Sequence, residues 1–169
     1  EKQYLNGGFK TPTKKMEFKS TILDKYAQVF GYEALPVYKP PKYSFEENPE
    51  LAKDYPFILN SGTRLPMFIH SRTFRLNWTK SLRPQVAADL NPQDALSLGI
   101  KQDDQIYIAT PKDRILVTAN LTKMVLPGVV NVYHGYAEAN VNDLIEADYV
   151  DPISSFPGFK SLLCKVEKV

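Results

Sequence analysis

The segment Asn91–Ile115 constrains the fold more than any other part of the chain, because it specifies both ends of a helix and then two turns with a strand between them. Asn91 is a good N-cap residue, and Pro92 follows at the first helical position, where a missing N–H costs nothing. Gly99 suits the left-handed position at which a helix ends. The segment therefore predicts a helix of about two turns that ends at Gly99.

Alternating apolar residues follow this helix. In "QIYIAT", Ile106 and Ile108 are separated by one residue, as expected for a half-buried strand. After the turn "PKD", the segment "RILVTANLT" reads as the returning strand, and "LPGVVNVYH" reads as a turn followed by another strand. One face of the returning strand is expected to carry Ile115, Val117 and Ala119.

The rest of the C-terminal two thirds also favours β structure. "FILNSG" (57–62) is a short apolar strand that ends in a turn, and "MFIHSRTF" (67–74) is a second extended candidate. Between Tyr55 and Gly135 we count about six strand candidates and one well-defined short helix. This pattern predicts a mainly β fold with short helices, and the number of strands suits a small closed barrel, in which closure removes exposed strand edges.

The first 50 or so residues have a different character. "KMEFKS" is strand-like, and "STILDKYAQVFG" predicts a helix capped at Ser20 and ended at Gly31. The segment 34–56 then holds 5 of the 13 prolines, a density that favours an extended course with little regular structure. We therefore divide the chain into an extended N-terminal arm, residues 1–54, which would connect to upstream domains, and a barrel domain, residues 55–169.

Composition excludes several classes of function. The chain has 169 residues, of which 43% are hydrophobic and 24% charged, an ordinary globular composition. A net charge of +2, with scattered Lys and Arg, gives no support for nucleic-acid binding. The single cysteine, Cys164, excludes a disulfide framework and a cysteine-based metal cluster within this chain. No apolar run approaches the roughly 20 residues of a membrane span, so we expect a soluble protein.

Few residues carry a recognisable catalytic pattern. His70 and His134 are far apart in the sequence, and neither has a cysteine or carboxylate at metal-ligand spacing, so we interpret each as a hydrogen-bonded structural residue. The chain lacks a Gly-x-Ser-x-Gly elbow, a P-loop and a Gly-x-Gly-x-x-Gly motif, which leaves a Ser-His-Asp triad and the two common nucleotide-binding motifs unsupported. Three aspartates stand in turns and are interpreted as turn residues: Asp103, Asp104 and Asp113.

The segment "NSGTRLPMFIHSR" offers a different kind of site. At the end of a strand, Ser61, Gly62, Thr63 and Arg64 would supply backbone N–H groups, two hydroxyls and a guanidinium. These groups can hold a phosphate or the edge of a nucleotide. The alternative is a polar strand-to-loop turn without a ligand.

Five segments taken together resemble a known family. In order, they are "GFKTPTKKMEF", "YPFILNSGTRLPMFIHS", "LNPQDALSLGIKQDDQIYIATPKDRI", "VLPGVVNVYHG" and "NVNDLIEADYVDPISSFPGFKS". They resemble the C-terminal molybdopterin-dinucleotide-binding domain of the dimethyl-sulfoxide-reductase superfamily of molybdenum and tungsten oxidoreductases, from Gly8 to about Lys168. The resemblance implies a double-psi β-barrel of the aspartate-decarboxylase-like type.

The resemblance also implies a cofactor and partners. The cofactor would be bis(molybdopterin guanine dinucleotide) with molybdenum or tungsten, gripped by this domain late in the chain of a larger prokaryotic oxidoreductase of anaerobic respiration. The domain alone would be inactive, since the metal ligand and any iron–sulfur cluster would come from upstream domains of the same polypeptide. An iron–sulfur electron-transfer subunit is a further implied partner, and the location would be cytoplasm or periplasm.

Matched position by position, the family's motifs imply a set of cofactor-contacting residues. The strand end and its loop would supply donors to phosphate or pterin oxygens, the "NVNDLI" amides would contact a heterocycle edge, and "GFKS" would place a basic residue near a cofactor anion or carbonyl. No residue of this chain would be catalytic or a metal ligand. The implied cofactor-binding residues are Ser61, Gly62, Thr63, Arg64, His70, Ser71, Asn140, Asn142, Phe159 and Lys160. His134, in an "HG" pair typical of the family, could face the same cavity.

Some residues depart from the family pattern. Asp103 and Asp113 stand where the family often has glycine, but Asp tolerates the left-handed conformation better than most residues, so the barrel should survive. Ile145 replaces a common Thr and removes one possible hydroxyl contact. Two other functions stay open: a free-standing barrel that serves as a binding or protein-interaction module, and a small hydrolase or lyase that uses His70 or His134.

Overall fold

The computed structural model describes the chain except for residues 1–3, 32, 64, 70 and 75. It divides into two compact units, Glu1–Lys39 and Pro40–Val169. The first unit contains α1 (Thr21–Phe30), whose N-cap Ser20 accepts a hydrogen bond from the Leu23 N–H and whose end is at Gly31, with a φ of +68°. These bounds confirm the predicted helix.

The predicted strand over 15–20 is wrong, because this segment folds into bends and turns. The Thr13 N–H and hydroxyl both donate to Glu17 Oε1, at 3.0 and 2.8 Å, and the Thr21 hydroxyl donates to the other oxygen of the same carboxylate at 3.1 Å. These hydrogen bonds hold the chain in a compact turn in which it cannot extend as a strand.

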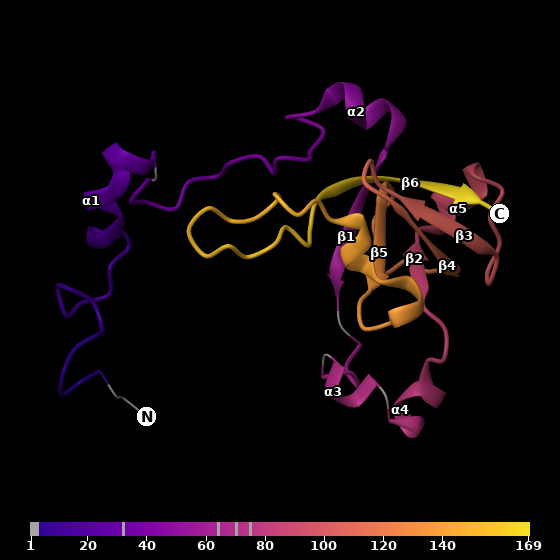
Figure 1. Ribbon diagram of the computed structural model, residues 1–169, viewed down its shortest axis with the longest axis horizontal. Helices are drawn as coiled ribbons and strands as arrows, with labels where there is room; N and C mark the ends of the chain where they lie inside the picture. Colours follow the sequence, from indigo (N-terminus) through magenta and orange to yellow (C-terminus); the bar gives the residue numbers. More distant parts are fainter. Residues whose placement is uncertain (1–3, 32, 64, 70, 75) are drawn as a thin grey trace. The chain divides into compact units, whose positions relative to one another are not determined.

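In the second unit, the strands found among the described residues close into a six-stranded barrel (Figure 1). The order around the barrel is β1-β5-β2-β4-β3-β6, in which β1/β5 and β2/β4 are parallel and the other pairs are antiparallel. The strands are β1 (Phe57–Thr63), β2 (Ala87–Leu90), β3 (Gln105–Ala109), β4 (Arg114–Leu121), β5 (Val129–Tyr133) and β6 (Leu162–Lys168). A mainly β fold with a closed barrel is therefore confirmed, whereas the double-psi type stays a prediction.

The barrel interior is formed by residues that alternate along each strand. On β3, Ile106 and Ile108 are fully buried, as predicted. On β4, the predicted apolar face is also buried, together with neighbours from β1, β2 and β5. The central members of this core are Leu59, Leu90, Val117, Ala119, Val130 and Val132.

The capped helix of the sequence analysis is α5 (Pro92–Ser97). Asn91 Oδ1 accepts a hydrogen bond from the Gln93 N–H at 3.0 Å, and Gly99 has a φ of +65°. Asp103 also adopts a positive φ, +67°, in the turn where the family pattern has glycine. The local chemistry of this segment therefore agrees with its structure.

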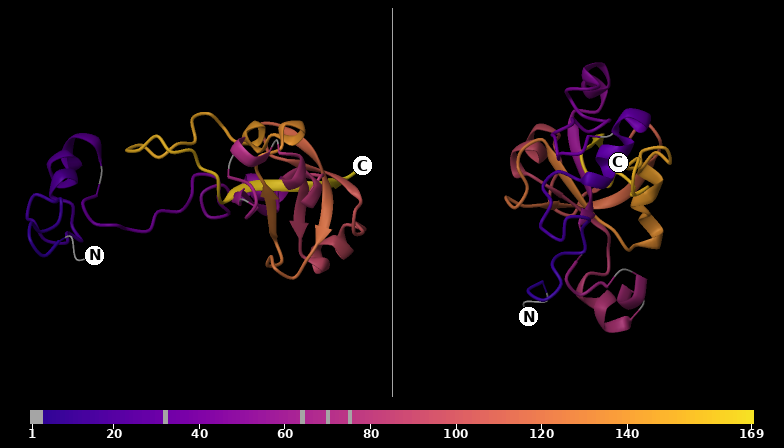
Figure 2. Two further views of the ribbon diagram at one scale, coloured as in Figure 1. Left: turned by 90° about the horizontal axis from the view of Figure 1, so that it is seen from below. Right: turned by 90° about the vertical axis from the view of Figure 1, so that its left-hand side faces the viewer.

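The extended candidate 67–74 is wrong, since it contains α3 (Ser71–Phe74) and leads to α4 (Asn77–Leu82). The Thr73 hydroxyl accepts from the Ile69 N–H at 2.7 Å and donates to the Met67 carbonyl at 2.8 Å, which folds the segment on itself. Two views show α3 and α4 together at one end of the barrel (Figures 1 and 2). Neither of these two short helices is predicted individually by the sequence pattern.

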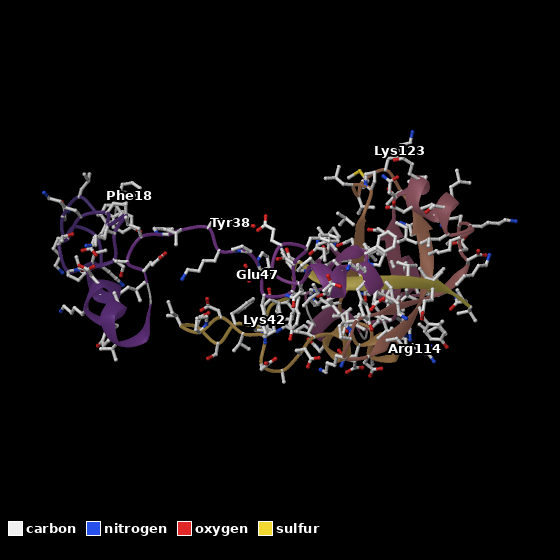
Figure 3. The ribbon with its side chains drawn as sticks, turned by 90° about the horizontal axis from the view of Figure 1, so that it is seen from above. Phe18, Tyr38, Lys42, Glu47, Arg114 and Lys123 are labelled. Carbon is white, nitrogen blue, oxygen red and sulfur yellow. The ribbon has the colours of Figure 1, made fainter. Side chains whose placement is uncertain are left out.

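Residues 40–54 cluster with the barrel, whereas the sequence analysis assigns them to the arm. Lys42, labelled in Figure 3, forms an ion pair with Asp148 at 2.9 Å, and the Tyr43 ring packs edge-on against Tyr149 at 5.1 Å. The segment also contains α2 (Pro49–Asp54), which begins at a proline. Of the described helices, none is both long and apolar enough to cross a membrane.

Candidate functional site

A pocket lies at the carboxyl ends of the parallel strands β1 and β5. Because these strands run in the same direction, the residues that follow them emerge at the same edge of the barrel, where ligands of sheet proteins commonly bind. The pocket has a volume of about 280 Å³, and we call it the strand-end pocket. It is lined by Ser61, Gly62, His134, Val141, Asn142, Phe156 and Phe159.

Gly62 forms part of one wall of this pocket and has no side chain to fill it. A Cβ atom at this position would lie 3.3 Å from the Phe159 Cβ, so Phe159 would have to shift slightly, and 3.8 Å from the Lys160 Cε, an ordinary contact distance. The Phe156 and Phe159 rings meet edge-on at 5.5 Å and add aromatic surface. Gly62, Phe159 and Lys160, which the sequence analysis places at the site, therefore lie together around one wall.

Ser61 lines the pocket, but its donors point elsewhere. Its side chain is fully buried, and both its N–H and its hydroxyl donate to the Phe159 carbonyl, at 3.0 and 2.7 Å. Ser61 thus ties β1 to the segment that carries Phe159 and Lys160. In this structure Ser61 helps to position that segment, and its contact with the cofactor stays a prediction.

Asn142 is presented to the pocket by a short helical turn. The turn is η2 (Val141–Leu144), and the Asn140 side-chain oxygen caps it by accepting from the Asn142 N–H at 3.2 Å. The same oxygen accepts from Asn142 Nδ2 at 3.0 Å. Asn140 therefore orients the Asn142 amide, and only Asn142 lines the pocket itself.

His134 follows β5 and also lines the pocket, and its N–H donates to the Thr63 carbonyl at 3.3 Å. Two predicted site residues, Arg64 and His70, lie outside the described residues. Ser71 is the first residue of α3. The sequence analysis missed Val141 and Phe156; the recurrence of an aromatic residue three positions before Phe159 is the signal that could have revealed Phe156.

Thr63 belongs to a hydrogen-bonded chain of polar side chains that runs over neighbouring strands of the barrel. Its hydroxyl donates to Asn131 Oδ1 at 2.5 Å, and Asn131 Nδ2 donates to Asp89 at 2.9 Å. Asp89 is 4% exposed and also accepts from Asn120 Nδ2 and the Tyr133 hydroxyl, both at 2.7 Å. No motif in the sequence indicates this network, because its members come from separate strands.

Burial and nearby charged groups affect two members of this network, Tyr133 and Asp89. Burial raises the pKa of Tyr133 above its ordinary value, and the hydrogen bond to Asp89 adds to the shift. The Arg83 guanidinium stands 3.7 Å from Asp89 and 4.8 Å from the Tyr133 ring centroid.

Burial also raises the pKa of the Cys164 thiol, so this group stays protonated. Within the described ranges, no group of three or more His, Cys, Asp or Glu side chains could hold a metal ion.

Comparisons with known proteins show the family to which this fold belongs. Residues 57–163 match the family described as "Molydopterin dinucleotide binding domain". The chain is 29% identical over 173 residues to dopamine dehydroxylase of Eggerthella lenta and 30% identical over 128 residues to acetylene hydratase of Syntrophotalea acetylenica, covering 95% and 76% of this chain and 17% of each relative. The solved structure of acetylene hydratase from Pelobacter acetylenicus superimposes with a TM-score of 0.83 at 26% identity, covering 96% of this chain and 24% of that one.

The matched region covers more than half of the chain and includes the whole strand-end pocket. The chain therefore belongs to the molybdopterin-dinucleotide-binding domains of the dimethyl-sulfoxide-reductase superfamily. The resemblance noted in the sequence is thereby confirmed, and the class of cofactor is a molybdopterin. The chain spans about a sixth of the length of these curated relatives.

The residues of the strand-end pocket suit part of such a cofactor. Aromatic rings offer surface for a planar heterocycle, an asparagine amide can both donate and accept at its edge, and Gly62 allows close approach to backbone. The fit thus depends on three features of one cavity: the absence of a side chain at Gly62, the oriented amide of Asn142, and the apolar rings of Phe156 and Phe159.

Proposed function

We propose that the strand-end pocket holds the nucleotide part of a molybdopterin guanine dinucleotide. The observation that carries this proposal is the juxtaposition of the oriented Asn142 amide with Phe156 and Phe159 in one cavity. An amide that donates and accepts side by side is complementary to the edge of guanine. Lys160, exposed beside Gly62, would supply a positive charge to a phosphate or carbonyl of the cofactor.

We infer that the pocket takes only one part of the cofactor. Sites for drug-sized ligands measure about 300–1,000 Å³, and the volume here, about 280 Å³, is below that range. The remaining walls would come from upstream domains of a larger oxidoreductase, in agreement with the length of the relatives. Those domains would hold the molybdenum or tungsten centre, which supplies the redox or Lewis-acid chemistry, and any iron–sulfur cluster.

The same proposal extends to the role of this domain in the whole enzyme. In such an enzyme this domain would close the cofactor cleft and take no part in bond making. An iron–sulfur electron-transfer subunit would be a partner in a prokaryotic, anaerobic respiratory context, to which relatives named as formate dehydrogenase and tetrathionate reductase lend support. The cofactor contacts of this chain would come from two groups of residues: the strand end Ser61, Gly62 and Thr63, and the residues Asn142, Phe159 and Lys160.

The proposal predicts selective binding of guanine nucleotides by the purified chain. GDP, titrated while the amide NMR spectrum is recorded, should shift the signals of pocket residues, and ADP should bind more weakly because its base edge is not complementary. Asn142→Ala and Lys160→Ala should each lower the affinity for GDP about three- to tenfold through one lost hydrogen bond or charge contact.

Matched controls remove the same side chains elsewhere. Asn77→Ala, at the start of α4, and Lys123→Ala, in the connection between β4 and β5, replace exposed residues outside the strand-end pocket and should bind GDP as the wild type does. If millimolar GDP shifts no pocket residue, or if the four variants bind alike, the proposed site is wrong.

A further inference from the structure

We propose that the turn between β3 and β4 positions Asn142 for ligand binding, through Lys112 and Thr110. This inference rests on the proposed function of the strand-end pocket. Neither Lys112 nor Thr110 lines that pocket. Both act on the backbone of η2, the short turn that presents Asn142, so they are positioning residues rather than contacts of the cofactor.

Lys112 contacts the carboxyl end of η2. Its Nζ donates to the Ile145 carbonyl at 2.6 Å and to the Asn142 carbonyl at 3.3 Å. The carbonyl groups at the end of a helical turn lack partners further along the turn and carry partial negative charge, so a lysine ammonium stabilises them. Lys112 therefore acts directly on the backbone of the residue whose side chain enters the pocket.

Thr110 supplies a second, buried contact to the same turn. Its hydroxyl donates to the Leu144 carbonyl at 2.9 Å, and the residue is 6% exposed. Val141 and Leu144 are themselves buried in the core cluster, which anchors both ends of η2. Thr110 and Lys112, both from the β3–β4 turn, therefore hold the consecutive carbonyls of Leu144 and Ile145.

The Asn142 backbone is thereby held at both of its polar groups. Its N–H donates to the Asn140 side chain, and its carbonyl accepts from the Ile145 N–H at 3.2 Å as well as from Lys112. A side chain whose backbone is already ordered loses less conformational freedom when a ligand binds. Loss of Lys112 should therefore weaken ligand binding although the lysine does not touch the ligand.

A double-mutant cycle on the full 169-residue chain tests this proposal, with GDP as the probe. Lys112→Met keeps the aliphatic stem and removes the ammonium group; it should lower the affinity for GDP about three- to fivefold. In an Asn142→Ala background the same change should have almost no effect, because the amide that Lys112 positions is gone. Lys112→Arg retains donors at the turn and should keep most of the affinity.

A readout without ligand separates positioning from general stability. In Lys112→Met, amide hydrogen exchange of Asn142–Ile145 should accelerate, while the exchange of β2 and β4 amides stays as in the wild type. The control is Lys123→Met. Arg114 directly follows the β3–β4 turn, and Figure 3 shows Lys123 on the opposite side of the barrel from Arg114. The control variant should change neither the exchange nor the affinity for GDP.

The possible outcomes distinguish the two proposals. If Asn142→Ala binds GDP as tightly as the wild type, the proposed function of the pocket fails. If Asn142→Ala weakens binding but Lys112→Met behaves like Lys123→Met, the positioning role alone fails. Additive losses in the double variant, or unchanged exchange of Asn142–Ile145, would also overturn it.

Discussion

Asp89 shows how much a single residue contributes to this barrel. It lies on β2 between the core residues Ala88 and Leu90, so its side chain points to the opposite face. Three neutral donors and the Arg83 guanidinium surround its carboxylate. A buried charge is tolerated in a protein only with such compensation, and the donors in turn depend on Asp89 for their acceptor.

Asp89→Ala should lower the free energy of unfolding by about 3 kcal/mol, because it leaves buried amide and hydroxyl donors without an acceptor. Urea denaturation followed by circular dichroism measures this change. Asp54→Ala, which removes an exposed carboxylate at the end of α2, should change the value by less than about 0.5 kcal/mol. Similar losses in both variants would mean that the Asp89 network adds nothing specific.

At the scale of elements, α5 and its flanking residues behave as a self-contained unit. Asn91 caps the helix, and the Ile100 N–H returns to the Ala95 carbonyl at 2.8 Å around the left-handed Gly99. Such a unit depends on neighbours in the sequence rather than in space. Its bounds could therefore be predicted closely, in contrast to those of α3 and α4, which depend on side chains such as Thr73 and on packing at the barrel end.

Gly99→Ala should destabilise the protein by about 1 kcal/mol, since a Cβ in the left-handed region costs roughly this amount. No atom lies within 4 Å of the position that this Cβ would take, so the loss reports backbone conformation alone. Gly99→Asn is the matched comparison, and it should lose less because asparagine tolerates a positive φ. Equal losses for Ala and Asn in thermal denaturation would contradict this explanation.

At the scale of the whole domain, barrel closure buries groups that would titrate in the unfolded chain. Cys164 on β6 is fully buried, and burial also raises the pKa values of Tyr133, Tyr136 and Tyr149. A group whose pKa is raised by folding stabilises the native state below its unfolded pKa, and this stabilisation is lost as the pH rises through and beyond that value. The barrel should therefore weaken in alkaline solution, first through the thiol and then, near pH 10, through the tyrosines.

Between pH 8 and 9.5, the wild type should lose about 1.2 kcal/mol more stability than Cys164→Ala, because only the unfolded wild-type thiol ionises in this range. Urea denaturation at both pH values, with a reducing agent present, measures the difference. The Ala variant will be less stable throughout because of the cavity that it creates, so the slope with pH and not the absolute value is the test. Parallel pH profiles would show that Cys164 is not shielded.

The candidate site was predictable only in part. The "SGTR" strand end and the "NVNDLI" and "GFKS" segments resemble family motifs, and Gly62, Asn142, Phe159 and Lys160 do lie together in space. The same motifs do not reveal that the N–H and the hydroxyl of Ser61 both donate to the Phe159 carbonyl. Nor do they reveal that the Asn140 side chain accepts a hydrogen bond from Asn142 and does not line the pocket. Those roles depend on contacts between residues that are far apart in the chain or on the side-chain geometry within a turn.

Elements with local signals could be predicted from the sequence alone: α1 with its two caps, α5 with Asn91 and Gly99, and the alternation of β3 and β4. The pairing of the strands, in contrast, depends on tertiary contacts and is known only from the structure. The register places Asn60, Asn131, Asp89 and Asn120 side by side on four neighbouring strands, and the parallel pairing of β1 with β5 creates the strand-end pocket. Capping and periodicity act over a few residues, whereas pairing joins residues tens of positions apart through the burial of a shared core.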